Sequence, residues 1–192
     1  MFDLDALVAS CHEALVEEEP RRVVREILLR TLEQPGAVAE RLGRSEGGLE
    51  ILFNSPDLTV LNVVWAPRMS LYPHDHRMWA VIGIYGGAED NTLFRRSPRG
   101  LVRSGAKVLA EGEVLSLGAE AIHSVDNPMA RFTGAIHVYG GDFVNQPRSQ
   151  WAPETLREQP YDAAQVRRVF DDANASWADE VSKTSGPQPR PG

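Results

Sequence analysis

The chain has 192 residues, of which 42% are hydrophobic and 24% are charged. This composition is typical of a globular protein and excludes a disordered chain. The length suits one domain with a hydrophobic core, which we place at residues 1–181. The net charge is −7 and the basic residues do not gather in one block, so we expect no nucleic-acid partner.

The sequence shows neither the pattern of a transmembrane helix nor that of a secretory signal. No apolar run approaches the ~20 residues that cross a bilayer, so we expect no membrane partner. The segment from Met1 to Asp5 carries acids where a secretory signal carries Lys or Arg. Cys11 is the only cysteine, which excludes an internal disulfide and suits a reducing compartment. We therefore expect a cytoplasmic protein.

Helical periodicity marks both ends of the chain. Two amphipathic stretches separated by a proline fill a helical part over about residues 3–34, which Pro35-Gly36 is expected to close. A last helix is predicted over about residues 161–178. The segment 182–192, rich in Ser, Gly and Pro, is expected to be disordered.

Between these ends, from about residue 49 to 145, short runs of Val, Ile, Leu and aromatic residues alternate with Gly, Pro, Asn and Asp. This alternation predicts short strands arranged as a sandwich or a barrel. The predicted strands cover residues 49–53, 58–65, 70–75, 78–85, 90–96, 101–110, 113–117, 121–126 and 131–139.

Four of the five histidines fall in this β region, and imidazole is the commonest protein ligand for transition metals. His74 and His76 are two residues apart, so on a strand both side chains point to one face, while Asp75 points away. His123 begins a later strand after a glycine-containing turn and can supply a third imidazole. Three neutral nitrogens with open positions beside them suit a redox iron, and they also suit zinc.

Together these segments resemble the paired motifs of the cupin superfamily. The matching residues are His74, His76 and Gly87 in the first motif and Gly112, His123 and Asn127 in the second. Ala80 replaces the usual glutamate ligand, which points to a three-histidine site. The resemblance implies a mainly β protein, a cupin double-stranded β-helix (jelly-roll barrel) with N-terminal helices and a C-terminal helix.

Among cupins, the chain resembles the bacterial cysteine dioxygenase-like (thiol dioxygenase) proteins. Residues 73–83 are similar to their first motif and residues 122–127 to their second. Residues 135–139 look like their Ser-x-His-x-Tyr triad, with Ala135 in place of Ser. The resemblance implies an Fe(2+) cofactor, held by the metal ligands His74, His76 and His123.

The triad segment also assigns two catalytic residues. Residues 137 and 139 share one strand face, so His137 and Tyr139 are expected to point together toward the metal. A phenol hydroxyl there can donate a hydrogen bond to substrate or dioxygen, and the imidazole can orient it.

Substrate-binding residues follow less directly. Residues 49–61, before the first motif, contain neither the Arg nor the Gln that binds the substrate carboxylate in these dioxygenases. Arg68 is the nearest later candidate, and Tyr72 and Trp79 are candidate pocket walls.

We therefore expect an iron(II) dioxygenase whose partners are O2 and a small-molecule thiol. Two alternatives stay open: a three-histidine oxygenase acting on another small molecule, such as a diketone or a nitrogen compound, and a cupin that binds a ligand without catalysis. The oligomeric state, monomer or homodimer, is also open.

Overall fold

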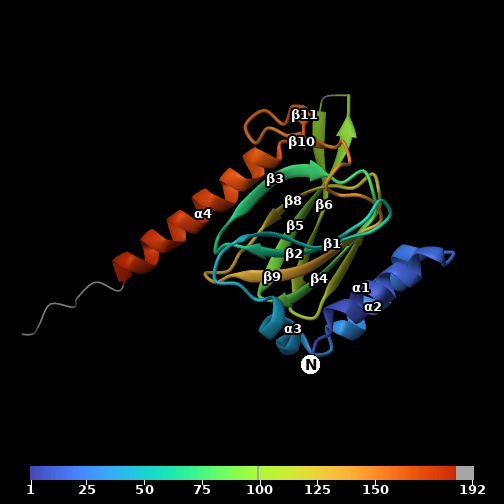
Figure 1. Cartoon of the computed structure of the whole chain (residues 1–192). Helices are drawn as coiled ribbons and strands as arrows, with labels where there is room; N and C mark the ends of the chain where they lie inside the picture. The colour runs from blue at the N-terminus through green and yellow to red at the C-terminus, as the bar shows by residue number, and fades with distance from the viewer. Residues whose placement is uncertain (99, 185–192) are drawn as a thin grey trace, which may run out of the picture.

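The structure is a computed structural model that describes residues 1–98 and 100–184. Two facing antiparallel sheets form its centre (Figure 1). Their strands are β1 (Gly48–Asn54), β2 (Thr59–Trp65), β3 (Ser70–Asp75), β4 (Ala80–Gly86), β5 (Ala88–Ser97), β6 (Gly100–Ala110), β7 (Val114–Leu117), β8 (Ile122–Asp126), β9 (Thr133–Tyr139), β10 (Ser149–Trp151) and β11 (Glu158–Pro160).

The strand order defines a jelly roll. One sheet has the order β1-β2-β9-β4-β7, and the other has the order β11-β10-β3-β8-β5-β6. Strands β2 to β9 thus form two interleaved four-stranded sheets, β2-β9-β4-β7 and β3-β8-β5-β6, which is the arrangement of a double-sheet jelly roll. The predicted fold class is confirmed.

The central strands of the first sheet are buried on both of their faces. Nearly every residue of β2, β4 and β9 is buried, because one face meets the other sheet and the opposite face is covered by helices. Such strands read as continuous apolar runs. In the second sheet, β5 and β6 mix buried and exposed positions, which is typical of a sheet with one face toward solvent.

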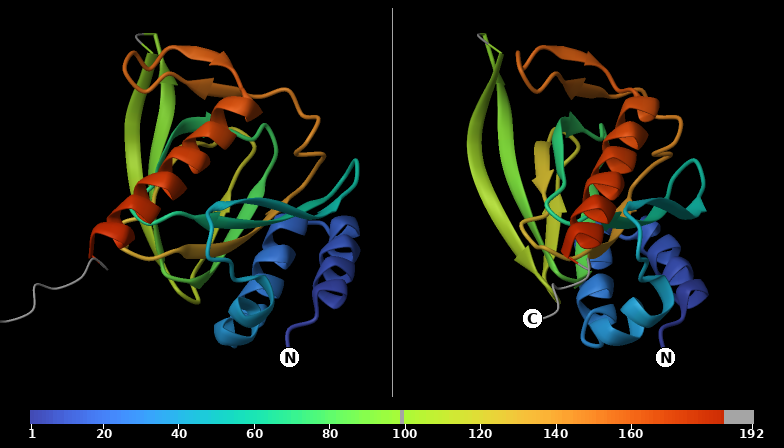
Figure 2. Two further views of the ribbon diagram at one scale, coloured as in Figure 1. Left: turned by 60° about the vertical axis from the view of Figure 1, so that its left-hand side comes forward. Right: turned by 90° about the vertical axis from the view of Figure 1, so that its left-hand side faces the viewer.

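The N-terminal helices supply that cover (Figure 2). They are α1 (Leu4–Glu13), the 3-10 turn η1 (Ala14–Val16), α2 (Pro20–Thr31) and α3 (Pro35–Leu42). Leu28 of α2 and Val38 of α3 share one buried cluster with Val81 of β4 and Val138 of β9. Our expectation that Pro35-Gly36 closes the helical part was wrong. Pro35 instead begins α3, since proline fits the first helical turn, where its missing N–H would have no helical acceptor.

The C-terminal helix α4 (Ala163–Thr184) lies across the barrel from α1 and α2 (Figure 1). Its Phe170 ring stacks on Trp65 of β2 with the ring centroids 5.5 Å apart. The helix extends to Thr184 rather than to about residue 178, so the first residues of the segment expected to be disordered are helical. Residues 185–192 lie outside the described part. Within residues 1–98 and 100–184, no helix combines the length and hydrophobicity of a membrane span.

The hairpin formed by β10 and β11 was not predicted. Its strands have three residues each, too few to show a two-residue period. The hairpin matters for the site because β10 pairs with β3, with Gln150 opposite His74.

Two motif residues have structural roles. Gly87 turns the chain between β4 and β5 with a φ of 85°, and a side chain there would collide with Thr133. The buried Asn127 donates to the carbonyl oxygens of Trp65 and Ala66 at 3.1 and 2.9 Å. Both residues hold the barrel together at the turns that flank its strands.

Candidate metal centre

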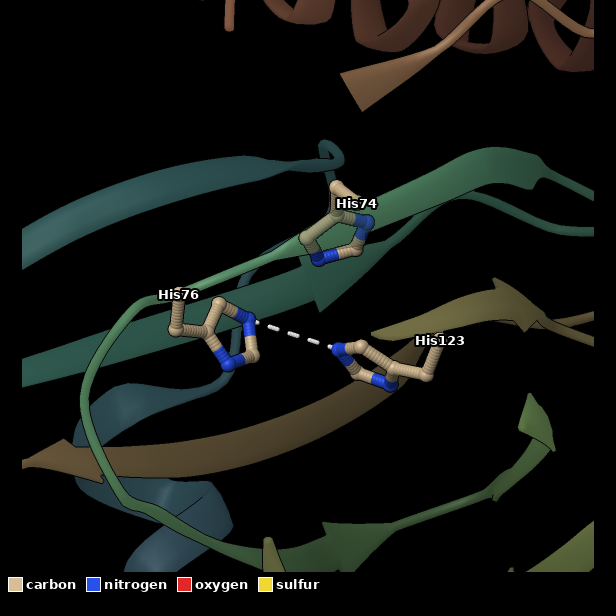
Figure 3. Close-up of side chains that lie close together, drawn as sticks. All are labelled: His74, His76 and His123. Carbon is tan, nitrogen blue, oxygen red and sulfur yellow. Dashed lines mark hydrogen bonds between the residues drawn. The ribbon is translucent and has the colours of Figure 1, made fainter. Parts of the chain in front are cut away.

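Three imidazoles converge inside the barrel (Figure 3). His74 at the end of β3 and His123 on β8 are cross-strand partners, with ring centroids 4.6 Å apart. His76 follows β3 and lies 5.2 Å from His74 and 5.0 Å from His123, again between ring centroids. One ligand nitrogen from each residue lies within 4.8 Å of the other two. The structure therefore brings together the three histidines that the sequence singled out.

Hydrogen bonds to Nδ1 set which nitrogen faces the centre. His74 Nδ1 donates to the carbonyl oxygen of Tyr72 at 3.1 Å, and His123 Nδ1 lies 2.7 Å from the Oδ1 of Asn91. A carbonyl oxygen only accepts, so each of these imidazoles carries its proton on Nδ1 and has a bare Nε2. An outer acceptor of this kind is the usual partner of a metal-ligating histidine.

Burial keeps all three imidazoles neutral. It lowers the pKa of His74 to about 4. Burial also lowers the pKa of His76 and His123 well below 6.5, and the neighbouring imidazoles lower it further. Metal binding requires the neutral ring, so these side chains are ready to ligate at neutral pH.

The nitrogen spacing also fits a shared ion. The Nε2 atoms of His76 and His123 are 3.3 Å apart. Nitrogens bound to one ion at about 2.1 Å, with bond angles from octahedral to tetrahedral, lie about 3.0–3.4 Å from each other. His76 Nδ1 is buried and has no hydrogen-bond partner within the described residues. The chain thus has a cupin-type jelly roll with a three-histidine group that can hold a metal ion.

Tyr139 and His137 lie beside this group on β9. The ring of Tyr139 is 5.0 Å from that of His76, and its hydroxyl is 2.9 Å from His137 Nδ1. His137 Nε2 is buried without a partner among the described residues. A buried bare acceptor costs less than a buried orphan N–H, so we assign the proton of His137 to Nδ1, which donates to the phenol oxygen.

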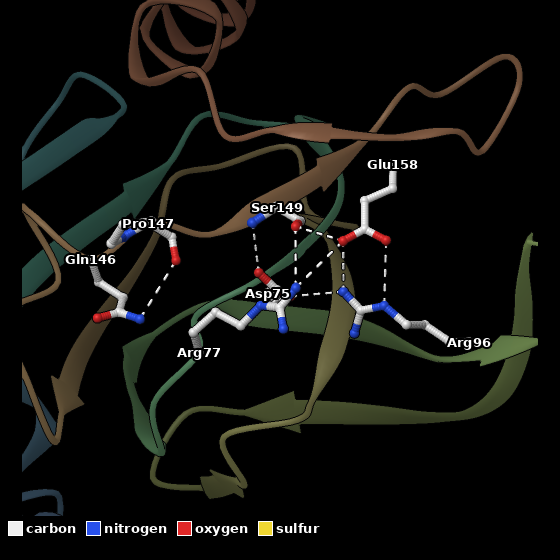
Figure 4. Close-up of polar contacts among 7 residues, drawn as sticks. All are labelled: Asp75, Arg77, Arg96, Gln146, Pro147, Ser149 and Glu158. Atoms are coloured by element: carbon white, nitrogen blue, oxygen red, sulfur yellow. Dashed lines mark hydrogen bonds and ion pairs between the residues drawn. The ribbon is translucent and has the colours of Figure 1, made fainter.

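Asp75, which the strand alternation predicts to point away from the imidazoles, lies in a network of arginines and Glu158 (Figure 4). Its buried carboxylate accepts from Arg77 at 2.7 Å, Arg96 at 3.2 Å and the backbone N–H of Ser149 at 2.7 Å. Glu158 of β11 pairs with the same two arginines. The network ties β3, β5 and the β10–β11 hairpin together behind the metal group.

Of the weaker candidates, Arg68 and Trp79 lie elsewhere. Arg68 is exposed and pairs with Glu180 of α4 at 2.5 Å. Trp79 packs with the cluster under the N-terminal helices and covers Gly140, outside the barrel interior. The reason is strand parity: Ala80 faces inward, so its neighbour faces outward.

Tyr72 is half-buried at the edge of the interior. Its hydroxyl donates to Gln150 Oε1 at 3.2 Å, and its carbonyl oxygen holds His74. Burial raises the pKa of its phenol to about 12. Its clearest role is to orient a metal ligand.

Arg148 near the centre was not singled out from the sequence. Its guanidinium lies between the rings of Phe143 and Tyr161, 3.9 Å from each centroid. Phe143 in turn is 4.3 Å from the Tyr139 ring. The charge of Arg148 adds to burial in lowering the pKa of His74. It follows the last predicted strand in a segment without periodicity, so no sequence signal placed it here.

Glu89 and Asn91 of β5 are also interior residues that sequence reasoning missed. Glu89 is fully buried and accepts from Trp65 Nε1 at 2.7 Å and from Asn91 Nδ2 at 2.8 Å. Burial raises the pKa of Glu89 to about 7, although both hydrogen bonds oppose the shift. The alternation of Glu89 and Asn91 on one strand face was the available signal.

No family model matches the chain. Solved structures with a similar fold include an uncharacterized conserved protein with a double-stranded β-helix domain from Klebsiella pneumoniae, at 12% identity over 58% of this chain and 87% of that chain, with a TM-score of 0.47. A cupin superfamily protein from Desulfitobacterium hafniense is 16% identical over 55% and 88% of the two chains, with a TM-score of 0.45. An RmlC-like cupin from Methanocaldococcus jannaschii is 13% identical over 53% and 85%, with a TM-score of 0.44. The jelly-roll assignment rests on the strand order.

Proposed function

We propose that the chain is a mononuclear non-haem iron(II) dioxygenase of the thiol dioxygenase type. The observation that supports this most is a protonated phenol beside three converging imidazoles, with Tyr139 next to His76 and hydrogen-bonded to His137. A purely structural metal site has all its positions filled by protein and needs no hydroxyl donor at its edge.

A bound iron(II) ion would supply a redox centre with open coordination positions for a thiol and for dioxygen. The three neutral imidazoles hold that ion on one side. Burial raises the pKa of Tyr139 above its ordinary value, so the phenol keeps its proton. Because His137 donates to the phenol oxygen, the phenol O–H is free to donate a hydrogen bond into the centre.

Arg148 supports a substrate that carries an anion. A pocket of about 380 Å³ between β1 and α4 is lined by Arg148, Phe143, Tyr161 and Leu61. Phe143 lines this pocket and also contacts His76, with ring centroids 6.1 Å apart. Arg148 Nε is buried without a partner among the described residues. A carboxylate can take a guanidinium edge in a paired hydrogen bond, so Arg148 replaces the arginine missing from β1 and β2.

The proposed reaction needs no further reactant. Both atoms of dioxygen are added to sulfur, so RSH and O2 give the sulfinic acid RSO2H. The electrons gained by dioxygen are those lost by sulfur. The thiol proton is carried into the sulfinic acid and is released when that acid ionises in water.

Dioxygen uptake by the iron(II)-loaded protein tests this function. We expect uptake with mercaptopropionate or cysteine and much less with the carboxylate-free thiols mercaptoethanol and cysteamine. With ¹⁸O-labelled dioxygen, the sulfinate product should contain two labelled oxygens. No uptake with any thiol, while iron stays bound, would refute the thiol reaction and favour an oxygenase for another small molecule.

The variant Arg148→Gln tests whether Arg148 binds the substrate carboxylate without taking part in the reaction at sulfur. It should raise the KM for the carboxylate thiols about 10- to 100-fold, the loss of a hydrogen-bonded charge pair, without a matching change for mercaptoethanol. Arg167→Gln is the matched control, since Arg167 lines the same pocket from the exposed side of α4. Equal effects of the two variants would remove Arg148 from the substrate site.

A further inference from the structure

A chain of buried hydrogen bonds leads from β2 to a metal ligand. Trp65 Nε1 donates to Glu89 Oε2 at 2.7 Å, Asn91 Nδ2 donates to Glu89 Oε1 at 2.8 Å, and His123 Nδ1 lies 2.7 Å from Asn91 Oδ1. The four side chains come from β2, β5 and β8, and all of them are buried. The chain ends at His123, whose Nε2 faces the other imidazoles.

When Glu89 is ionised, the chemistry of Trp65 and Glu89 fixes the direction of every hydrogen bond in this series. The indole N–H can only donate, and the ionised carboxylate, which the hydrogen bonds from Trp65 and Asn91 favour, can only accept. Asn91 must therefore turn its NH2 toward Glu89, which leaves its carbonyl oxygen to face His123. That oxygen accepts a proton only from Nδ1, so Nε2 of His123 is left bare for a metal.

We propose that Glu89 is a positioning residue that sets the metal-binding tautomer of His123 through Asn91. The side chain of Glu89 is hydrogen-bonded to Trp65 and Asn91, which are both neutral and are not metal ligands. A buried carboxylate without a cationic partner is costly. We attribute the presence of this carboxylate to two effects. It can only accept hydrogen bonds, and its negative charge would lie near a divalent cation held by three neutral imidazoles. The inference rests on metal binding by the histidines and not on the oxygenase reaction.

Glu89→Gln is expected to reverse the donor and acceptor roles in the hydrogen bonds that lead from Glu89 to His123. If the oxygen of the new amide accepts from Trp65, the NH2 of that amide faces Asn91. Asn91 must then turn its carbonyl oxygen toward position 89 and its NH2 toward His123. His123 then accepts on Nδ1 and carries its proton on Nε2, where a metal would bind. If the amide turns the other way, two N–H donors face each other at Trp65. Metal affinity should fall about 10- to 100-fold, as for other outer partners of metal ligands.

An exchange of acid and amide should restore the direction. In Glu89→Gln/Asn91→Asp, the amide oxygen accepts from Trp65, its NH2 donates to the new carboxylate, and that carboxylate accepts from His123 Nδ1–H. The net charge equals that of the original chain. We expect cobalt(II) affinity within about threefold of the original protein, a coupling that independent packing effects do not give. Asp90→Asn removes one charge from the same strand and should leave the affinity unchanged.

The test uses cobalt(II) titration of the metal-free chain and its variants, with ¹⁵N NMR of the imidazoles in the metal-free state. The original protein and the double variant should show His123 protonated on Nδ1, and Glu89→Gln should show it protonated on Nε2 with weaker cobalt(II) binding. A double variant that binds no better than Glu89→Gln would overturn the proposal. So would protonation on Nε2 in the unsubstituted chain, a measurement that needs no variant to fold. Loss of the oxygenase activity alone would bear on the proposed function only.

Discussion

Buried neutral histidines should make the metal-free protein sensitive to acid. Burial is the main cause that lowers the pKa of His74 to about 4, of His137 to about 3, and of His76 and His123 well below 6.5. Between these values and 6.5, each imidazole binds a proton only after the chain unfolds. The unfolded state then binds more protons, so the free energy of unfolding falls as the pH falls below about 6.5.

The size of this effect follows from the shifts. At about pH 5, a histidine with an unfolded pKa of 6.5 and a folded pKa of about 4 lowers the free energy of unfolding by about 2 kcal/mol. His137, with a folded pKa of about 3, lowers it by a similar amount, so these two residues together lower it by about 4 kcal/mol, against a typical total of about 5–15 kcal/mol. His76 and His123 act in the same direction, so metal-free protein should be much less stable at about pH 5 than at neutral pH.

Urea unfolding in the presence of a chelator, at several pH values between about 7.5 and 5, measures this dependence. His137→Gln should reduce the fall by about 2 kcal/mol, since it removes one buried imidazole that is not a metal ligand. His12→Gln is the matched control, because His12 is exposed on α1. A free energy of unfolding that stays constant between about pH 6.5 and 5 would refute the reasoning.

Three further outcomes are expected. Tyr139→Phe should lower kcat about 100-fold with iron content unchanged, since it removes only the donor hydroxyl; an unaltered kcat would exclude that role. Asp75→Asn should lower the free energy of unfolding by about 1–3 kcal/mol in urea, because the buried acceptor of two partly exposed arginines loses its charge; equal stability would contradict the role of this network. Cys11 should resist alkylation in the native state, because it is fully buried and burial raises its pKa to about 12; rapid labelling of the folded chain would show that α1 opens.

The barrel and the metal group were accessible from the sequence because both depend on local spacing. Glycine and proline between short apolar runs marked the strands β1 to β9, and the two-residue spacing of His74 and His76 placed both imidazoles on one face. The same parity rule would have placed Trp79 outside the barrel.

Other features depend on pairing that no local pattern shows. Arg148 is placed by stacking on Phe143 and Tyr161, and Tyr161 reaches it because β10 pairs with β11 and brings the two ends of that hairpin together. The hydrogen bonds through Glu89 need β5 and β8 paired in one sheet and β2 facing them from the other sheet. From the sequence alone, Glu89 in Gly87-Ala88-Glu89-Asp90 is indistinguishable from an exposed residue of a polar turn.

The most direct test of the metal centre is anomalous diffraction at the iron edge from crystals grown anaerobically with iron(II). One peak per chain is expected, within about 2.2 Å of a nitrogen from each of His74, His76 and His123. A map with no peak there, or with iron bound only at other residues, would contradict the site on which the proposed function depends.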